Sequence, residues 1–245
     1  IFFASSNTIP SFLCTGNHEA NMVTSDSTFY LSKEDIHQCL FSNPNYAYQQ
    51  TEQENYYYAD VKEPNGNIIR FIVLDNTDQP TFKYNTQHIS CITQKQIDWF
   101  IQTALQKDMT EKHSIIVLTH HPLQEYSKNQ ETYMCGGTHL YKATLIPTII
   151  DAFQQRKSIS QSYKSTVSPT NTIHINGNFT QAKGEFICYL GGHAHTYGNF
   201  NVGIEGGAKQ IMLLANTLSP SLQNNNYGNI DRDANHNKYN SFSIH

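Results

Sequence analysis

The chain contains 245 residues, of which 15% are charged, and its formal net charge at pH 7 is -4. This length allows one large domain with a sizeable hydrophobic core. The low, slightly negative charge argues against a nucleic-acid binder that neutralises phosphates, and no apolar run approaches the roughly 20 residues of a membrane-spanning helix. The five cysteines match no zinc-binding spacing, so they leave the redox compartment unassigned.

A strand, a histidine loop and a capped helix are predicted near the start of the chain. Residues 11–14 are apolar and lead into Gly16-Asn17-His18-Glu19, so we expect a strand followed by a polar loop. Ser32 suits an N-cap, and the acidic residues that follow it would favour the dipole of a short helix. We therefore expect Asp35 and His37 to lie on the surface of that helix.

A β-hairpin and an amphipathic helix are predicted next. Residues 56–60 and 68–74 are rich in strand formers and bracket an Asn-Gly turn signal, and the second run is apolar enough to lie centrally in a sheet. Residues 93–106 place apolar side chains at three-to-four spacing, which predicts a helix. Trp99 lies off that apolar face, so we expect it to contact a neighbouring element.

Two further apolar runs end in histidine-containing loops. Residues 114–118 lead into Thr119-His120-His121-Pro122, and residues 186–190 lead into Gly191-Gly192-His193-Ala194-His195. Both runs read as buried strands. In open α/β sheets, ligands bind at the carboxyl ends of strands, so each loop is a candidate site.

The remaining segments complete a single predicted domain that spans residues 1–245. Residues 143–155 predict a second amphipathic helix, and residues 156–183, rich in Ser, Thr and Asn, are expected to form a surface excursion. Residues 210–215 predict one more strand, followed by an Asn-rich, turn-like segment at 221–240 and the start of a strand at 241–245. The sequence contains no internal repeat and no linker.

The ordered motifs GNHE, HHP and GHAH resemble those of the calcineurin-like metallophosphoesterases, which include purple acid phosphatases and many phosphodiesterases. The resemblance covers nearly the whole chain, and residues 184–190 are most similar to enzymes of Gram-positive bacteria and their phages. It implies an α/β fold of the four-layer αββα sandwich type, with two mostly β layers and helices outside. It also implies hydrolysis of a phosphodiester or phosphomonoester by a two-metal centre.

The resemblance assigns metal ligands to the loops that follow the three strands. Asn17, His120 and His193 would bind one divalent metal, and His195 would bind the other. A mixture of nitrogen and oxygen ligands admits Mn, Fe, Co, Ni or Zn. A complete enzyme would hold two such ions.

Other roles are implied for residues that do not bind metal. His18 would protonate the leaving oxygen, and Glu19 would orient the imidazole and favour its protonated form. His121 either contacts the substrate or shapes the turn before Pro122. His139 is a weaker candidate for the rim of the substrate pocket.

Part of the family pattern is missing. The family requires Asp-x-His and Gly-Asp-x-x-Asp before GNHE, but the chain contains no Gly-Asp dipeptide and only thirteen residues precede Cys14. The triplet Asp35-Ile36-His37 comes after GNHE and inside a predicted helix. We therefore expect a fragment that lacks the N-terminal part of the domain. Such a chain would bind at most one metal and would be inactive alone.

Two functional interpretations remain open. The first is a metal-dependent phosphoesterase in the full-length protein, where a phosphoester is the substrate and an N-terminal segment completes the site. The second is a catalytically inactive module of the same fold that binds within a larger assembly, such as a phage particle or a cell-surface complex. A virion or cell-surface location rests on analogy alone.

Overall fold

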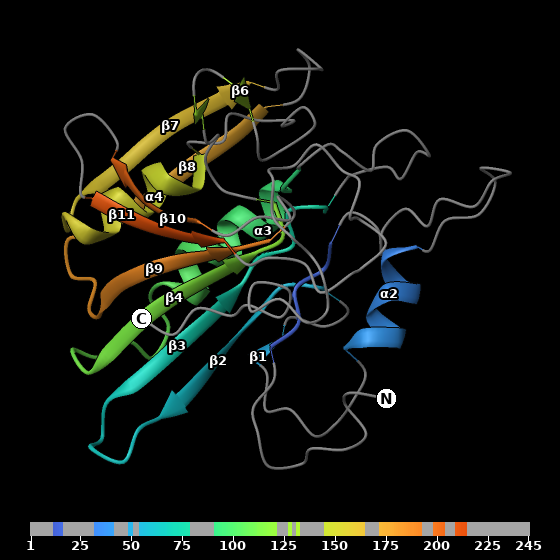
Figure 1. Cartoon of the computed structure of the whole chain (residues 1–245). Helices are drawn as coiled ribbons and strands as arrows, with labels where there is room; N and C mark the ends of the chain where they lie inside the picture. Colours follow the sequence, from blue (N-terminus) through green and yellow to red (C-terminus); the bar gives the residue numbers. More distant parts are fainter. Residues whose placement is uncertain are drawn as a thin grey trace, which may run out of the picture.

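The structure is a computed structural model that describes residues 12–16, 32–41, 49–50, 54–78, 91–121, 127–128, 131–132, 145–164, 172–192, 198–203 and 209–214. Its described part is built on a seven-stranded mixed sheet with the order β1-β2-β3-β4-β9-β11-β10 (Figure 1). The strands are β1 (Gln49–Gln50), β2 (Tyr57–Lys62), β3 (Ile68–Val73), β4 (His113–Thr119), β9 (Glu185–Gly191), β10 (Gly198–Gly203) and β11 (Lys209–Leu214).

The four central strands β3, β4, β9 and β11 run parallel to one another. At their carboxyl ends, Val73 lies opposite Leu118, and Gly191 of β9 lies opposite both Thr119 and Leu214. The loops that follow these strands therefore begin at one edge of the sheet. Strands β2 and β10 flank these four strands and are antiparallel to β3 and β11, respectively, and the short β1 is antiparallel to β2.

The predicted hairpin is confirmed as β2 and β3, which are joined by residues 63–67. Gly66 adopts φ +86°, a left-handed conformation that glycine enters without a Cβ penalty. The side chain of Asn65 supports the turn by accepting a hydrogen bond from the Asn67 N–H at 2.8 Å.

One face of the sheet is covered by helices, which form in the two ranges, 93–106 and 143–155, where helices are predicted. These are α3 (Gln94–Trp99), the π-helical segment η3 (Phe100–Ala104) that continues it, and α4 (Leu145–Gln154). Their apolar residues join those of β2, β3, β4 and β9 in the main hydrophobic core. Trp99 contacts a neighbouring element as expected, since its ring centroid lies 4.8 Å from that of Tyr56.

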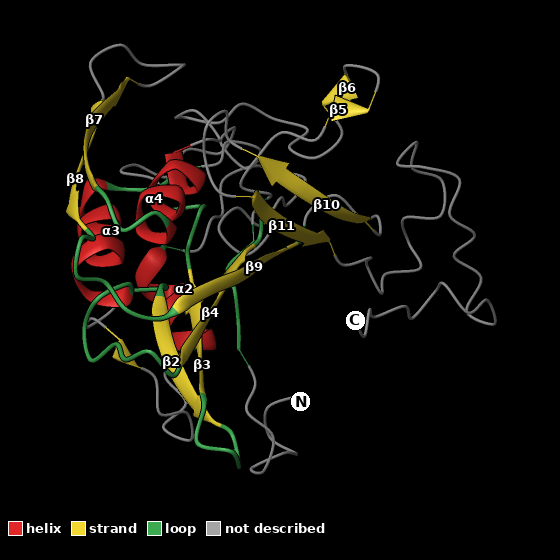
Figure 2. Cartoon of the chain, turned by 90° about the vertical axis from the view of Figure 1, so that its left-hand side faces the viewer, coloured by secondary structure: helices red, strands yellow, loops and turns green. Residues whose placement is uncertain are grey.

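The expectation of a surface excursion at residues 156–183 is wrong. This region forms a hairpin of β7 (Ser158–Lys164) and β8 (Thr172–Asn178), which lies on the far side of the helices from the main sheet (Figure 2). The residues Ile159, Ile173, Ile175 and Phe179 are buried in the main core. Alternation of apolar and polar residues, rather than overall polarity, determines this structure.

The other face of the sheet carries a second, smaller core. Residues 12–14 and α2 (Lys33–Leu40) pack there against Tyr57 and Val73. The helix begins with a capping box in which Ser32 and Asp35 bond each other's backbone N–H, so the predicted N-cap is confirmed. Asp35 is exposed, whereas His37 is half-buried and its Nδ1 lies 3.1 Å from the Glu54 carbonyl oxygen.

The predicted α/β class is confirmed. Outside the main sheet, β5 (Ser127–Lys128) and β6 (Glu131–Thr132) pair with each other as a separate two-stranded sheet. The helix predicted at 143–155 and the strand predicted at 210–215 are also present, as α4 and β11. The predictions for 221–240 and 241–245 lie outside the described residues. Among the helices that the structure describes, none has the length and apolar character needed to cross a membrane.

Candidate functional site

The loops of the HHP and GHAH motifs begin side by side. β4 ends at Thr119 directly opposite Gly191 of β9, and the Gly192 N–H then donates a hydrogen bond to the His120 carbonyl oxygen at 2.9 Å. A Cβ atom on Gly192 would lie 3.6 Å from Nδ1 of His120. The backbone that enters the GHAH loop is therefore in contact with the histidine of the HHP loop.

The segment that enters the GNHE motif lies at the same edge of the sheet. The Cys14 thiol donates to the Leu74 carbonyl oxygen at 3.4 Å, and the Leu74 N–H donates to the Leu118 carbonyl oxygen at 2.9 Å. Thr15 and Gly16, which follow Cys14, are buried. These contacts place the start of the GNHE loop beside the ends of β3 and β4.

The hydroxyl of Tyr57 fixes this segment further upstream. It accepts a hydrogen bond from the Leu13 N–H at 2.7 Å and donates one to the Leu13 carbonyl oxygen at 2.9 Å. Tyr57 is fully buried in β2, so its hydroxyl attaches the segment preceding GNHE to the sheet. The prediction of a strand at 11–14 is wrong for its described residues, because 12–14 pack against the sheet without forming a strand.

The structure describes two of the predicted site residues, His120 and His121. The other six lie outside the described residues: Asn17, His18, Glu19, His139, His193 and His195. The described part of the chain contains no group of three or more His, Cys, Asp and Glu side chains arranged to hold a metal ion. What it does show is that the three loops carrying the candidate ligands start at one edge.

The two adjacent histidines have different environments. His120 is half-buried, whereas the His121 side chain has 0% exposure. Their rings meet edge to face, with centroids 5.1 Å apart and an interplanar angle of 81°. Burial of His121 favours the interpretation that it shapes the turn. The half-buried His120 keeps an imidazole at the loop surface, and neutral imidazole suits borderline divalent metals.

A buried polar segment that the sequence motifs do not indicate follows β3. Its four residues, Asp75, Asn76, Thr77 and Asp78, are each at most 4% exposed. The Thr77 N–H and hydroxyl both donate to Oδ1 of Asp75, at 2.9 and 2.7 Å. We call these four residues the 75–78 segment. It lies at the carboxyl end of β3, beside the HHP loop.

Helix α3 holds the 75–78 segment through Gln96. The side-chain amide of Gln96 accepts from the Asp75 N–H and donates to the Asp75 carbonyl oxygen, both at 2.9 Å, and it also donates to Asp78 at 3.1 Å. Gln96 has 0% exposure, so these bonds are shielded from water. The Thr93 hydroxyl, at the N-cap of α3, donates to Asp78 at 2.6 Å.

Lysines connect the same segment to α2 and to the start of β2. Lys33 forms ion pairs with Asp78 at 2.8 Å and with Glu54, and Lys95 pairs with Glu54 at 2.5 Å. Burial alone would lower the pKa of Lys33, but the two carboxylates outweigh it and raise that pKa. Burial likewise opposes ionisation of Glu54, yet hydrogen bonds from the lysines lower its pKa overall.

Asp75 takes part in none of these ion pairs, and its pKa is raised, whereas that of Glu54 is lowered. Burial and the nearby charge of Asp78 raise the pKa of Asp75 to about 6, against the lowering effect of the two hydrogen bonds from Thr77. A carboxyl group that changes charge near pH 6 therefore lies close to the candidate site.

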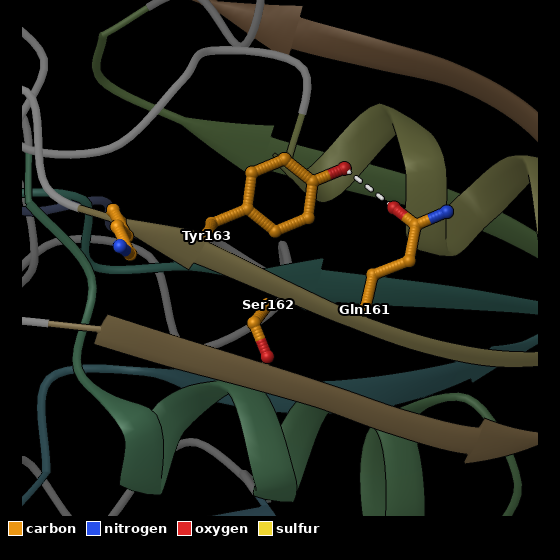
Figure 3. A pocket seen from close by; sticks show the side chains of 4 residues that line it. Gln161, Ser162 and Tyr163 are labelled. Carbon is orange, nitrogen blue, oxygen red and sulfur yellow. Dashed lines mark hydrogen bonds between the residues drawn. The ribbon is translucent and has the colours of Figure 1, made fainter.

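A shallow pocket occurs elsewhere, on β7. It is lined by Gln161, Ser162, Tyr163 and Lys164, and the Tyr163 hydroxyl donates to the Gln161 side-chain oxygen at 3.0 Å (Figure 3). None of the predicted site residues lines it. It brings together no set of groups with catalytic or metal-binding chemistry.

Comparison with models of known protein families finds no match for this chain, and comparison with curated proteins finds no related sequence.

Proposed function

We propose that the chain belongs to a metal-dependent phosphoesterase whose two-metal centre forms at the carboxyl edge of β3, β4 and β9, and that it carries about half of that centre. The observation that supports the proposal most strongly is the convergence of the three loop entries. Cys14 contacts Leu74, and Gly192 bonds His120, so the segments before Asn17 and His193 both start next to the HHP loop. Loops that start together can contribute residues that bind the same metal ion.

The proposed ligands combine imidazole and amide donors. His120, Asn17 and His193 would hold one divalent ion, and His195 would contribute to the site of the second. Such ions polarise the phosphoryl oxygens and activate a hydroxide nucleophile when bound. His18 would hold the proton that the leaving oxygen requires, with Glu19 orienting its ring. His121 would shape the turn that presents His120.

We also propose that the complete domain has the four-layer αββα arrangement. Its second β layer would cover the sheet face opposite α3 and α4. On that face Ile116 and Leu118 are only half-buried, and Ile187, at the bulge of β9 next to Ile116, is 48% exposed. Apolar side chains in this position are suited to packing against a second sheet.

The test compares this 245-residue chain with the full product of its natural reading frame. Both would be assayed for bound metal and for hydrolysis of a nitrophenyl phosphodiester in excess Mn²⁺. We expect one weakly bound metal and negligible turnover for the chain, and two metals with turnover for the full product.

The inactive-module interpretation makes a different forecast for the same assay. A full product that binds no more than one metal and shows no turnover would refute the phosphoesterase and favour the module. Two tightly bound metals or robust turnover in the 245-residue chain would show that ligands outside the three motifs complete the centre.

A further inference from the structure

Asn76 contacts the HHP loop through both polar atoms of its side chain. Its Nδ2 donates to the His121 carbonyl oxygen at 2.7 Å, and its Oδ1 accepts from the His121 N–H at 3.2 Å. Asn76 is 4% exposed and His121 is fully buried. An amide that pairs with both groups of one residue's backbone fixes the position and the orientation of that residue.

The same carbonyl oxygen accepts a second side-chain hydrogen bond. The Thr119 hydroxyl donates to the His121 carbonyl oxygen at 2.8 Å, so both acceptor positions of this oxygen are used. One residue earlier, the His120 carbonyl oxygen accepts from the Gly192 N–H at 2.9 Å. The backbone on both sides of the His120 side chain is therefore bonded within the protein.

Asn76 is itself held rigidly. Its carbonyl oxygen accepts from the Cys91 N–H at 2.8 Å, and the residue before it, Asp75, is paired through its backbone with the Gln96 side chain. Two amide side chains thus act in series, with Gln96 fixing Asp75 and Asn76 fixing His121. This arrangement connects helix α3 to the loop that presents His120.

We propose that Asn76 is a positioning residue for the candidate centre, and that it acts with Thr119 by locking the His121 peptide so that His120 is presented in one orientation. This role rests on the proposed function, because it treats His120 as a ligand. Residues that do not touch the metal but hold its ligands in position contribute substantially to metal binding, and their removal typically lowers metal affinity by about 10–100-fold.

Asn76→Ala removes both hydrogen bonds, and Thr119→Val removes the hydroxyl while keeping the shape. We expect hydrogen exchange at the His121 amide to accelerate by at least about tenfold in Asn76→Ala, because its N–H loses its acceptor. We expect the affinity for Mn²⁺ to fall by about 10–100-fold in both variants. Thr119→Ser, which keeps the hydroxyl, should restore affinity close to that of the unmodified chain.

Asn55→Ala is the matched control, because Asn55 is a 1% exposed asparagine outside the hydrogen bonds of the HHP loop. It should lower the melting temperature without changing Mn²⁺ affinity or exchange at His121. Unchanged His121 exchange in Asn76→Ala, or an equal loss of affinity in Asn55→Ala, would overturn the positioning role. If the unmodified chain binds no Mn²⁺, the proposed function fails, while the exchange measurement still decides whether Asn76 locks the loop.

Discussion

Arg70 and Asp60 lie directly opposite each other on β3 and β2 and form a two-point ion pair, with Nε–Oδ1 and Nη2–Oδ2 distances of 2.7 Å. The Arg70 side chain has 0% exposure, and its Nη1 donates to the carbonyl oxygens of Ala104 and Lys107. Its guanidinium lies 4.0 Å from the centroid of the Tyr58 ring. One arginine therefore ties the hairpin to the end of η3.

Replacement of Arg70 by Met should destabilise the fold strongly. It leaves the buried Ala104 carbonyl oxygen, the partly buried Lys107 carbonyl oxygen and the Asp60 carboxylate without Arg70. Breaking a fully buried pair typically costs about 3–5 kcal/mol, and this half-buried pair should approach that range. Asp60→Asn should cost less, because Asp60 is 30% exposed. Urea unfolding followed by circular dichroism measures both. As a control, Lys183→Met breaks the exposed pair with Glu111 and should change stability by less than about 1 kcal/mol. Equal losses for Arg70→Met and Lys183→Met would contradict this interpretation.

The turn of the same hairpin depends on the left-handed conformation of Gly66. Gly66→Ala should lower the free energy of unfolding by about 1–2 kcal/mol, since a Cβ is strained at φ +86°. Gly66→Asn should lower it less, because asparagine tolerates this region better than alanine. Thermal unfolding of the two variants tests the order. Alanine as stable as glycine at this position would show that the turn relaxes.

Asp75 should impose a pH dependence that opposes the usual behaviour of carboxylates. Its raised pKa, about 6 against 3.8, means that the folded chain holds a proton that the unfolded chain has released. Its contribution to stability is therefore fully present below about pH 4 and is lost as pH rises to about 6, by at most about 1.4 kcal/mol per pH unit.

Asp75→Asn isolates that contribution, because the Asn oxygen can still accept from Thr77. The free energy of unfolding of the variant, minus that of the unmodified chain, should increase between pH 4 and pH 6 and then level off. Guanidinium unfolding at five pH values provides the measurement. A difference that stays constant over this range would show that Asp75 titrates normally.

Local signals predicted most of the described fold. Ser32 caps α2, the turn at Gly66 joins β2 to β3, and α4 forms where an amphipathic pattern occurs. The hairpin of β7 and β8 has the polar composition of a loop, so composition does not predict it, whereas its alternation does. In β8, Ile173 and Ile175 alternate with exposed polar residues, which is a half-buried strand pattern. The change from α3 to a π-helix at Phe100 depends on tertiary packing and has no comparable sequence signal.

The candidate site was only partly readable from the sequence. The repeated order of strand and histidine loop predicts that the HHP and GHAH loops lie at one edge of the sheet. The structure places these two loop entries together, through the hydrogen bond from Gly192 to His120. The polar run at 75–78 also follows a strand end, but it contains no histidine, so its role was overlooked. The contact between Asn76 and His121 depends on the placement of β3 beside β4, which brings two residues that are far apart in the sequence into hydrogen-bond distance.

His18, which lies outside the described residues, should affect chemistry without affecting metal content. In the full product, His18→Ala should reduce hydrolysis of alkyl phosphodiesters much more than that of nitrophenyl esters, because nitrophenolate leaves with little need for a proton. Steady-state rates on the two substrate classes, together with metal analysis, measure this. Equal losses for both classes would exclude His18 as the proton donor.

The central claim is that the three histidine loops share one metal, and equilibrium titration of the 245-residue chain with Mn²⁺ or Co²⁺ tests it most directly. The variants are His120→Ala, His193→Ala and, as a control, His174→Ala on β8, where the exposed His174 ring bonds Ser162. We expect one weak site that disappears in the first two variants and persists in the control. Binding that is unaffected by His120→Ala and His193→Ala, or lost equally in all three, would contradict the account.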